Sequence, residues 1–321
     1  MKLKKVFFMV LLVILIAAII GVLVIARNKT RRNSDKIQIV TSNFSCYDFL
    51  RQITKDDEDV EIVFLLGPGK DSHSYEPTTQ DIITIQKSKL FVYVGGESEK
   101  WAEKVIDSMA GEKHGKLMRI TDYVDKAAEE EIDGAEKEIE EEVEGSFDDH
   151  VWTSPSNAIK MVEALEKELE EINPNKKENY KQNAEDYIAK IKEVDSKIQD
   201  VVSNKVRDRL VFGDKMPMQY FMNYYGLKVS AAFNGCSTET EPAASTIAYL
   251  EKIVKEQNIP VVLYIELNNG RVAKTIAEEA GGAKALQIQT LHNVSLDDFN
   301  NGESWVSLME RNIDVLKEAL Q

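Results

Sequence analysis

Short runs of β-branched and aromatic residues alternate with amphipathic stretches in the first hundred residues. The apolar runs Ile37–Thr41, Val60–Leu66 and Leu90–Val94 are typical of buried strands. Helical spacing of apolar residues is found at Asp48–Thr54 and again from Thr79 to Ile85. Strands and helices in this order predict βαβ units that build a parallel sheet.

The same pattern returns in the second half of the chain. Strands are predicted at Arg209–Phe212, Val261–Ile265 and Ala285–Gln289. Helices are predicted between and after them, at Met218–Tyr225, Ala244–Gln257 and Val272–Ala280, with a last helix from Ser304. The second half of the chain is therefore also predicted to be an α/β unit.

Two long helical stretches separate these units. The first, Ser156–Glu171, ends at Asn173-Pro174, and the second, Lys176–Asn204, carries apolar residues at helical spacing. At about 1.5 Å per residue the second would be roughly 40 Å long, enough to link two lobes. We therefore predict an α/β fold with a first lobe at 36–173, a linking helix at 174–205 and a second lobe at 206–321.

The N-terminal segment, 1–35, indicates export. Three lysines precede an uncharged apolar run of 21 residues, Val6–Ala26, and a basic linker follows. Such a run is long enough to span a bilayer. We expect an export signal that is retained as a membrane anchor, with a cleaved signal as the alternative. The rest of the chain would then lie outside the cytoplasm.

Net charge narrows the range of partners. The chain carries a formal charge of -15, which excludes nucleic acid as a partner because phosphate binding needs clustered basic residues. Much of the acidity lies between Asp125 and Asp149, where thirteen acidic residues accompany two lysines. We expect this stretch to be a solvated insertion in the first lobe, and Glu129–Glu144 to be dispensable for folding.

The two cysteines, Cys46 and Cys236, form no CxxC motif, so no zinc-finger or redox motif is present. Two buried free thiols are expected, with a single disulfide between them as the alternative.

Histidine is scarce, and its placement is informative. Of four histidines, His73 and His292 each follow a predicted strand, and His150 precedes a helix. In open α/β sheets, ligands bind beyond the carboxyl ends of strands. Neutral imidazoles suit Zn²⁺ and other late divalent metals. His114 stands in a predicted surface turn and is left out of the candidate site.

Two longer motifs around these histidines resemble the ligand loops of zinc/manganese-type solute-binding proteins of ABC importers (the ZnuA/TroA type). They are Gly69-Lys-Asp-Ser-His-Ser-Tyr-Glu-Pro-Thr78 and Asp149-His-Val-Trp-Thr-Ser-Pro-Ser-Asn-Ala158. The helix ending in Tyr225-Gly-Leu227 and the Glu241-Pro242 turn are also similar to that family. The resemblance covers nearly all of residues 37–321.

The resemblance implies a metal held in the cleft between two lobes, with His73, His150 and His292 as ligands. At the position of the family's remaining ligand this chain has Lys215, which cannot bind a metal as an ammonium. Asp214, one residue earlier, is the expected oxygen donor. The cargo would be Zn²⁺, with Mn²⁺ as the alternative, and the partner would be the membrane permease of an ABC importer. We expect the receptor to be a monomer.

Two other function classes are compatible with a metal-binding chain of this kind. A membrane-anchored zinc hydrolase could use three imidazoles and an activated water. However, the sequence contains no HExxH motif and no carboxylate clearly placed as a general base. A surface or adhesive protein that uses a metal only for stability is the third possibility.

Overall fold

Two four-stranded parallel sheets form the centre of the computed structural model, which describes residues 36–71, 74–135, 147–235, 237 and 241–321. The first sheet has the order β2-β1-β3-β4, and the second has the order β6-β5-β7-β8. We call these sheets, with their covering helices, the first and the second lobe. The strands are β1 (Ile37–Thr41), β2 (Val60–Phe64), β3 (Leu90–Tyr93), β4 (Lys116–Arg119), β5 (Arg209–Met216), β6 (Lys228–Asn234), β7 (Val261–Ile265) and β8 (Lys284–Ile288). The predicted α/β class with two parallel sheets is confirmed.

Helices cover both faces of each sheet, because alternate residues of a buried strand point to opposite faces. In β1, Ile39 belongs to the core beneath α2 and α5, whereas Val40 packs with Ile85 of α3 and Val105 of α4 on the other side. These helices are α2 (Phe44–Ile53), α3 (Thr79–Lys87), α4 (Lys100–Ser108) and α5 (Pro155–Ile172). The second half of the chain adds α7 (Gln219–Tyr225), α8 (Ala244–Glu256), α9 (Arg271–Glu279) and α10 (Leu296–Asn300). Of these, α10 packs on the first lobe, where Phe299 contacts Tyr47 and Phe64.

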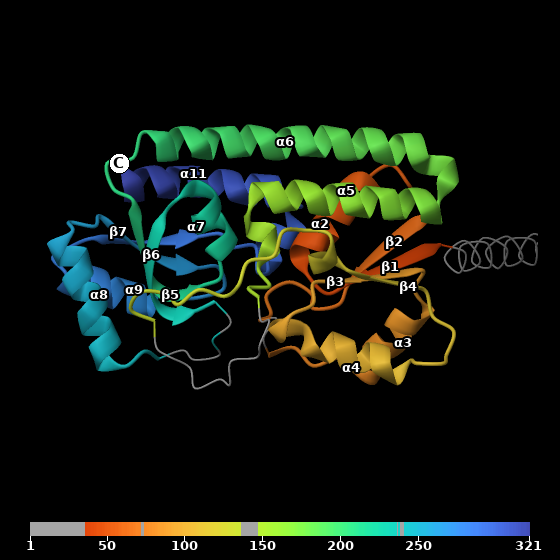
Figure 1. Ribbon diagram of the computed structural model, residues 1–321, viewed down its shortest axis with the longest axis horizontal. Coiled ribbons are helices and arrows are strands. Elements are labelled where there is room, and N and C mark those ends of the chain that lie inside the picture. Colours follow the sequence, from red (N-terminus) through yellow and green to blue (C-terminus); the bar gives the residue numbers. More distant parts are fainter. Residues whose placement is uncertain (1–35, 72–73, 136–146, 236, 238–240) are drawn as a thin grey trace, which may run out of the picture.

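The helix expected to link the lobes is present as α6 (Lys177–Ser203), which runs along both sheets (Figure 1). It buries a stripe that includes Tyr187, Ile191, Val194 and Ile198. That stripe packs against α2 and α5 of the first lobe and against α11. Its 27 residues give a length of about 40 Å at 1.5 Å per residue.

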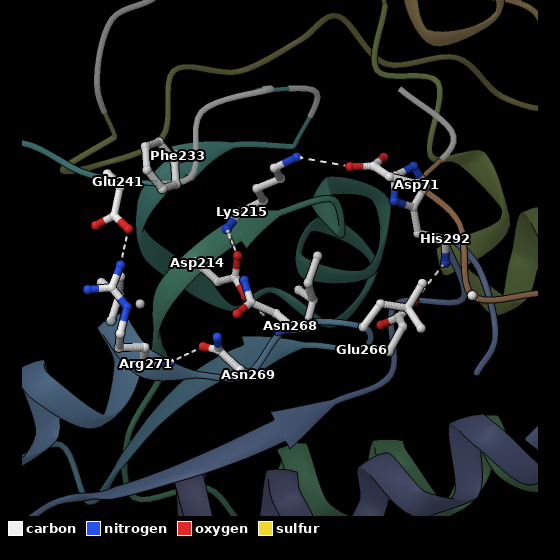
Figure 2. Close-up of a pocket in the computed structure, with 15 residues that line it drawn as sticks. Asp71, Asp214, Lys215, Phe233, Glu241, Glu266, Asn268, Asn269, Arg271 and His292 are labelled. Atoms are coloured by element: carbon white, nitrogen blue, oxygen red, sulfur yellow. Dashed lines mark hydrogen bonds and ion pairs between the residues drawn. The ribbon is translucent and has the colours of Figure 1, made fainter. Parts of the chain in front are cut away.

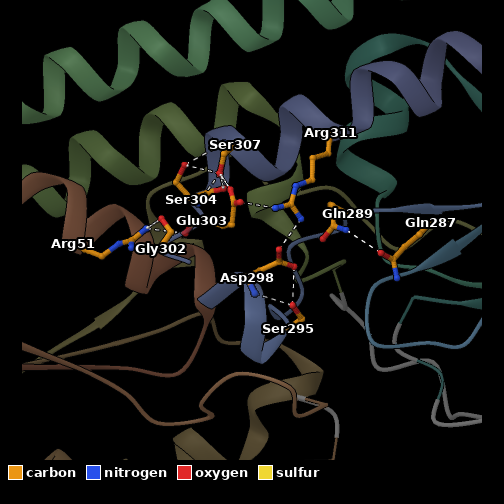
Figure 3. A network of polar contacts seen from close by, with 10 residues as sticks. All are labelled: Arg51, Gln287, Gln289, Ser295, Asp298, Gly302, Glu303, Ser304, Ser307 and Arg311. Carbon is orange, nitrogen blue, oxygen red and sulfur yellow. Dashed lines mark hydrogen bonds and ion pairs between the residues drawn. The ribbon is translucent and has the colours of Figure 1, made fainter. Parts of the chain in front are cut away.

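A second helix, α11 (Trp305–Leu320), also bridges the lobes, which the sequence did not predict. It packs on β5, β7 and β8 of the second lobe and on α2 of the first. At its start the backbone N–H of Trp305 donates to Asp48 Oδ2 of α2 at 2.8 Å. Nearby, Arg51 of α2 donates to the carbonyl of Glu303 (2.8 Å), within the polar network of Figure 3. The lobes are therefore joined by two helices rather than one.

Two strands and two α-helices were not predicted, namely β4 and β6, which lie at the edges of the sheets, and α4 and α10. A further difference concerns β5, which continues past Phe212 to Met216 through a register irregularity between Phe212 and Lys215. Asp214 therefore lies inside a bulged strand and not in a loop as expected. Bulges commonly occur beside functional sites because they redirect side chains.

Most side chains of residues 127–135, at the start of the acidic stretch, are exposed, but this segment also makes contacts with the second lobe that were not expected. We call this segment the strap, because it lies along the second lobe. Ile132 is 8% exposed, and the carbonyl of Asp133 accepts a hydrogen bond from Ala231 N of the edge strand β6 (3.1 Å). The carboxylate of Asp133 accepts hydrogen bonds from three further residues of that lobe: Arg209 (2.6 Å), Ser230 (2.9 Å) and Tyr249 (2.6 Å). Residues 136–146 lie outside the described part.

Two other expectations fall partly or wholly outside the described residues. Cys46 is a buried free thiol in α2, while Cys236 is not among the residues described. Within the described part of the chain, no helix combines the length and apolar character needed to cross a bilayer. The apolar run Val6–Ala26 lies outside that part.

Candidate metal centre

His150 is fully buried, and a carboxylate orients its ring. It lies at the turn before α5, where Asp148 Oδ1 accepts a hydrogen bond from the backbone N of His150 (2.7 Å) and pairs with its Nδ1 (2.9 Å). A carboxylate on one ring nitrogen fixes the tautomer and directs the other nitrogen at a metal. Metal binding by His150 would therefore use Nε2.

The charge state of His150 reflects two opposing effects. Burial lowers the pKa of its imidazole, but the carboxylates of Asp148 and Asp149 outweigh burial and raise that pKa to about 8. The same carboxylates increase the electron density of a neutral ring, so they favour binding of a cation in place of the proton.

Asp148, Asp149 and His150 form a group of potential metal ligands whose donor atoms lie within 4.8 Å of one another. Asp149 Oδ2, however, accepts hydrogen bonds from the N (3.0 Å) and Oγ (2.5 Å) of Ser98. Gly96 makes this close approach possible, because a Cβ there would lie 2.6 Å from Asp149 Cβ. We therefore interpret the two carboxylates as groups that orient His150.

His292 is held in the second lobe by a strained turn after β8. The preceding residue, Leu291, has a positive φ of 60° although it is not glycine. Glu266 spans this turn, because its carboxylate accepts hydrogen bonds from Thr290 N (2.8 Å), Thr290 Oγ1 (2.8 Å) and His292 N (3.0 Å). Burial raises the pKa of Glu266, against the lowering effect of these hydrogen bonds.

The structure brings His150 and His292 together from opposite lobes. Their ring centroids lie 5.3 Å apart, and the ring planes are tilted by 65°. Trp152 stacks on His292 at 6.1 Å, and its Nε1 donates to the carbonyl of Thr290 (3.0 Å). On the other side Gly235, after β6, comes so close that a Cβ would lie 3.2 Å from His150 Cε1.

The other two histidines have different positions. His73 lies outside the described residues, so its place relative to the other imidazoles stays a prediction. His114 is exposed in the turn before β4, in agreement with its omission from the site.

The loop that leads to His73 is nevertheless fixed against the second lobe. Asn293 Nδ2 donates to the carbonyls of Gly67 (3.0 Å) and Lys70 (2.5 Å), and Gly69 N donates to the carbonyl of Val294 (2.8 Å). We call these three hydrogen bonds the clasp. They join the chain just after His292 to the loop before His73.

A cavity of about 430 Å³ opens beside His292 (Figure 2). Asp214 lines it, but Oδ1 of that residue accepts a hydrogen bond from Lys215 N (2.8 Å) and Oδ2 accepts one from Ile265 N (3.1 Å). Burial raises the pKa of Asp214, against the lowering effect of these bonds. Lys215 extends across the cavity to Asp71, with 3.5 Å between Nζ and Oδ2.

Several residues of this region were not singled out from the sequence. Asp148, Trp152 and Asn293 adjoin the candidate histidines in the chain, and that adjacency was the available signal. Glu266 is buried and contacts the backbone of His292, but nothing in its sequence context marks it as part of the site. Its role depends on a fold contact across 26 residues, which no local pattern reveals.

Two α/β lobes joined by long helices, with a buried imidazole from each lobe meeting between them, define a two-lobed metal-binding protein. The family described as "Zinc-uptake complex component A periplasmic" (ZnuA) matches residues 39–319. The chain belongs to this family.

Individual relatives agree with that assignment. The high-affinity zinc uptake system protein ZnuA of Bacillus subtilis is 32% identical over 292 residues, which are 89% of this chain and 88% of that protein. The zinc-binding lipoprotein AdcA of Streptococcus pneumoniae is 30% identical over 305 residues, and the match covers 95% of this chain but 60% of AdcA.

A solved structure of part of AdcA extends the comparison to three dimensions. The Zn(II)-bound ZnuA-like domain of Streptococcus pneumoniae AdcA matches with a TM-score of 0.72 and 29% identity, over 89% of this chain and 99% of that one. The family and these relatives are described by zinc uptake and zinc binding, and the hydrolase alternative has no support among them.

Proposed function

We propose that this protein captures Zn²⁺ outside the cytoplasm and passes it to the membrane permease of an ABC importer. Mn²⁺ is the alternative cargo. The metal ligands in this proposal include the imidazoles of His150 and His292, together with His73 from the first lobe.

One observation supports this proposal most strongly. The imidazoles of His150 and His292 come from different lobes, and their ring centroids lie 5.3 Å apart beside Trp152. Two rings at this separation can reach one ion at Zn–N distances of about 2.0–2.1 Å after small adjustments. Nitrogen donors favour Zn²⁺ over Mn²⁺, since affinity rises across the late divalent metals.

The proposal is tested by metal analysis of protein purified without added metal, followed by competitive titration against a zinc-binding dye. His150→Ala should weaken zinc binding by about 100-fold or more, because the ion loses an imidazole ligand that Asp148 holds in place. His114→Ala is the matched control and should bind as the parent does. Equal losses in both variants would contradict the proposed site.

Delivery to a permease is tested separately. In the organism that carries this chain, loss of the protein should impair growth under zinc limitation, and the parent protein should restore that growth. If His150→Ala restores growth as well as the parent does, capture at this site is not the function.

A further inference from the structure

Among the residues that the structure describes, four carboxylates line the cavity beside His292 and could balance the charge of a captured metal. They are Asp71, Asp214, Glu241 and Glu266. Neutral imidazoles leave the +2 charge of the ion uncompensated, and oxygen from Asp or Glu is a common fourth ligand of zinc. These carboxylates differ in their hydrogen-bond and ion-pair partners.

Two of them are fixed by the protein backbone. Asp214 accepts hydrogen bonds from the backbone of Lys215 and Ile265, and Glu266 accepts hydrogen bonds on both sides of the strained Leu291. Turning either carboxylate toward a metal would leave buried N–H groups without acceptors, at a cost of about 1–3 kcal/mol each. These residues therefore support the cavity wall.

Glu241 lies at the far side of the cavity from His292. There it forms an ion pair with Arg271 at the start of α9, and both side chains are more than 60% exposed. Its position in Figure 2 is separated from His292 by Lys215 and Asp214. Glu241 is thus a poor candidate for an ion held by His292.

Asp71 differs from the other three in both position and partner. The clasp places Asp71 near His292 in space. Lys70, which precedes Asp71, accepts a hydrogen bond from Asn293, which follows His292. Asp71 is 48% exposed, and it forms an ion pair with the Lys215 ammonium at 3.5 Å. An ammonium on a flexible stem can exchange its partner for a divalent ion, whereas a fixed backbone N–H cannot.

We propose that Asp71 is the anionic oxygen ligand of the captured metal and that Lys215 holds this carboxylate while no metal is bound. The inference rests on the proposed function and specifies the chemistry of the same site. As the metal binds, the carboxylate passes from the ammonium to the ion, and Lys215 turns toward solvent. Lys215 occupies the sequence position of a metal ligand in the related family, but in this proposal it binds the carboxylate of Asp71 and not the metal.

The test compares three variants of the full chain by competitive zinc titration. Asp71→Asn should weaken zinc binding at least about tenfold, because it removes the charge but nearly keeps the shape. Asp71→Glu should recover part of that loss. Glu241→Gln, at the exposed far side of the same cavity, is the matched control and should bind zinc within about twofold of the parent.

Replacing Zn²⁺ by Co²⁺ distinguishes a metal ligand from a residue that affects binding at a distance, because the visible absorption of Co²⁺ depends on its ligands. The visible absorption bands of the Co²⁺ protein should change in Asp71→Asn and stay unchanged in Glu241→Gln. Parent-like zinc affinity in Asp71→Asn, or unchanged Co²⁺ bands, would overturn the assignment of Asp71. If that result is accompanied by loss of binding in His150→Ala, the proposed function stands and only this inference fails.

Discussion

Each of the two described histidines of the site is oriented by a buried carboxylate, but through a different group. Asp148 pairs with the ring Nδ1 of His150, whereas Glu266 holds the backbone N–H of His292. In both cases the imidazole is positioned before a metal arrives. Preorganisation of this kind reduces the entropy cost of binding and so favours tight capture.

A third buried carboxylate makes the stability of the protein depend on pH. Burial raises the pKa of Glu99 to about 7, against the lowering effect of hydrogen bonds from Ser42, Gly95 and Val94. Between pH 4.5, the ordinary pKa of this group, and pH 7, the folded protein binds more protons here than the unfolded chain. The contribution of Glu99 to the free energy of unfolding therefore falls as pH rises through this window, by about 1 kcal/mol for each pH unit.

Glu99→Gln isolates this effect, because an amide oxygen can still accept the hydrogen bonds of Val94 and Gly95. Urea unfolding of metal-free protein at pH 5 and pH 8 should show a smaller loss of stability with rising pH in the variant than in the parent. The difference should be about 3 kcal/mol. Identical pH profiles would contradict the raised pKa.

At the scale of structural elements, the contacts of the strap lead to a specific prediction about stability. Asp133 accepts hydrogen bonds from Arg209, Ser230 and Tyr249 of the second lobe. Asp133→Ala should lower the free energy of unfolding by about 1–3 kcal/mol, because these donors lose their acceptor. The measurement is urea unfolding of metal-free protein.

Asp125→Ala provides the control from the same acidic stretch. Its carboxylate is 80% exposed and pairs with Lys160, so the change should be within about 0.5 kcal/mol. Equal stability of the Asp133 and Asp125 variants would show that the carboxylate contacts of Asp133 contribute little to folding.

Elements with strong periodicity could be predicted from the sequence, and the others could not. Central strands such as β7 are continuous apolar runs, and α6 carries a long apolar stripe, so local pattern was sufficient for both. The edge strand β6 contains Ser230, Ala231 and Ala232, whose small side chains give little strand signal. The contacts of the strap could not be predicted, because its composition indicates only solvation and its partners lie about a hundred positions away in the sequence.

The candidate site was predictable to a similar degree. Scarce histidines, one after a strand and one before a helix, indicated His292 and His150, and the fold does bring these two rings together. For the oxygen donor the sequence indicated Asp214, and no local pattern pointed to Asp71. Only the structure shows that backbone N–H groups occupy both oxygens of Asp214.

At the scale of the whole molecule, the lobes are joined by more than a single linker. Helices α6 and α11 both span them, the strap lies along the second lobe, and the clasp connects loops at the site itself. These connections restrict relative motion of the lobes. We therefore expect metal exchange to involve the loops around Asp71 and His292 more than a wide opening of the lobes.

The central claim, that one metal is held between the lobes by His150 and His292, is tested most directly by anomalous diffraction. Crystals of the zinc-loaded protein would be measured on both sides of the zinc absorption edge. We predict one strong zinc peak at about 2.0–2.1 Å from Nε2 of His150 and from one ring nitrogen of His292. A zinc peak elsewhere, for instance on Asp148 and Asp149 without His292, would contradict this account.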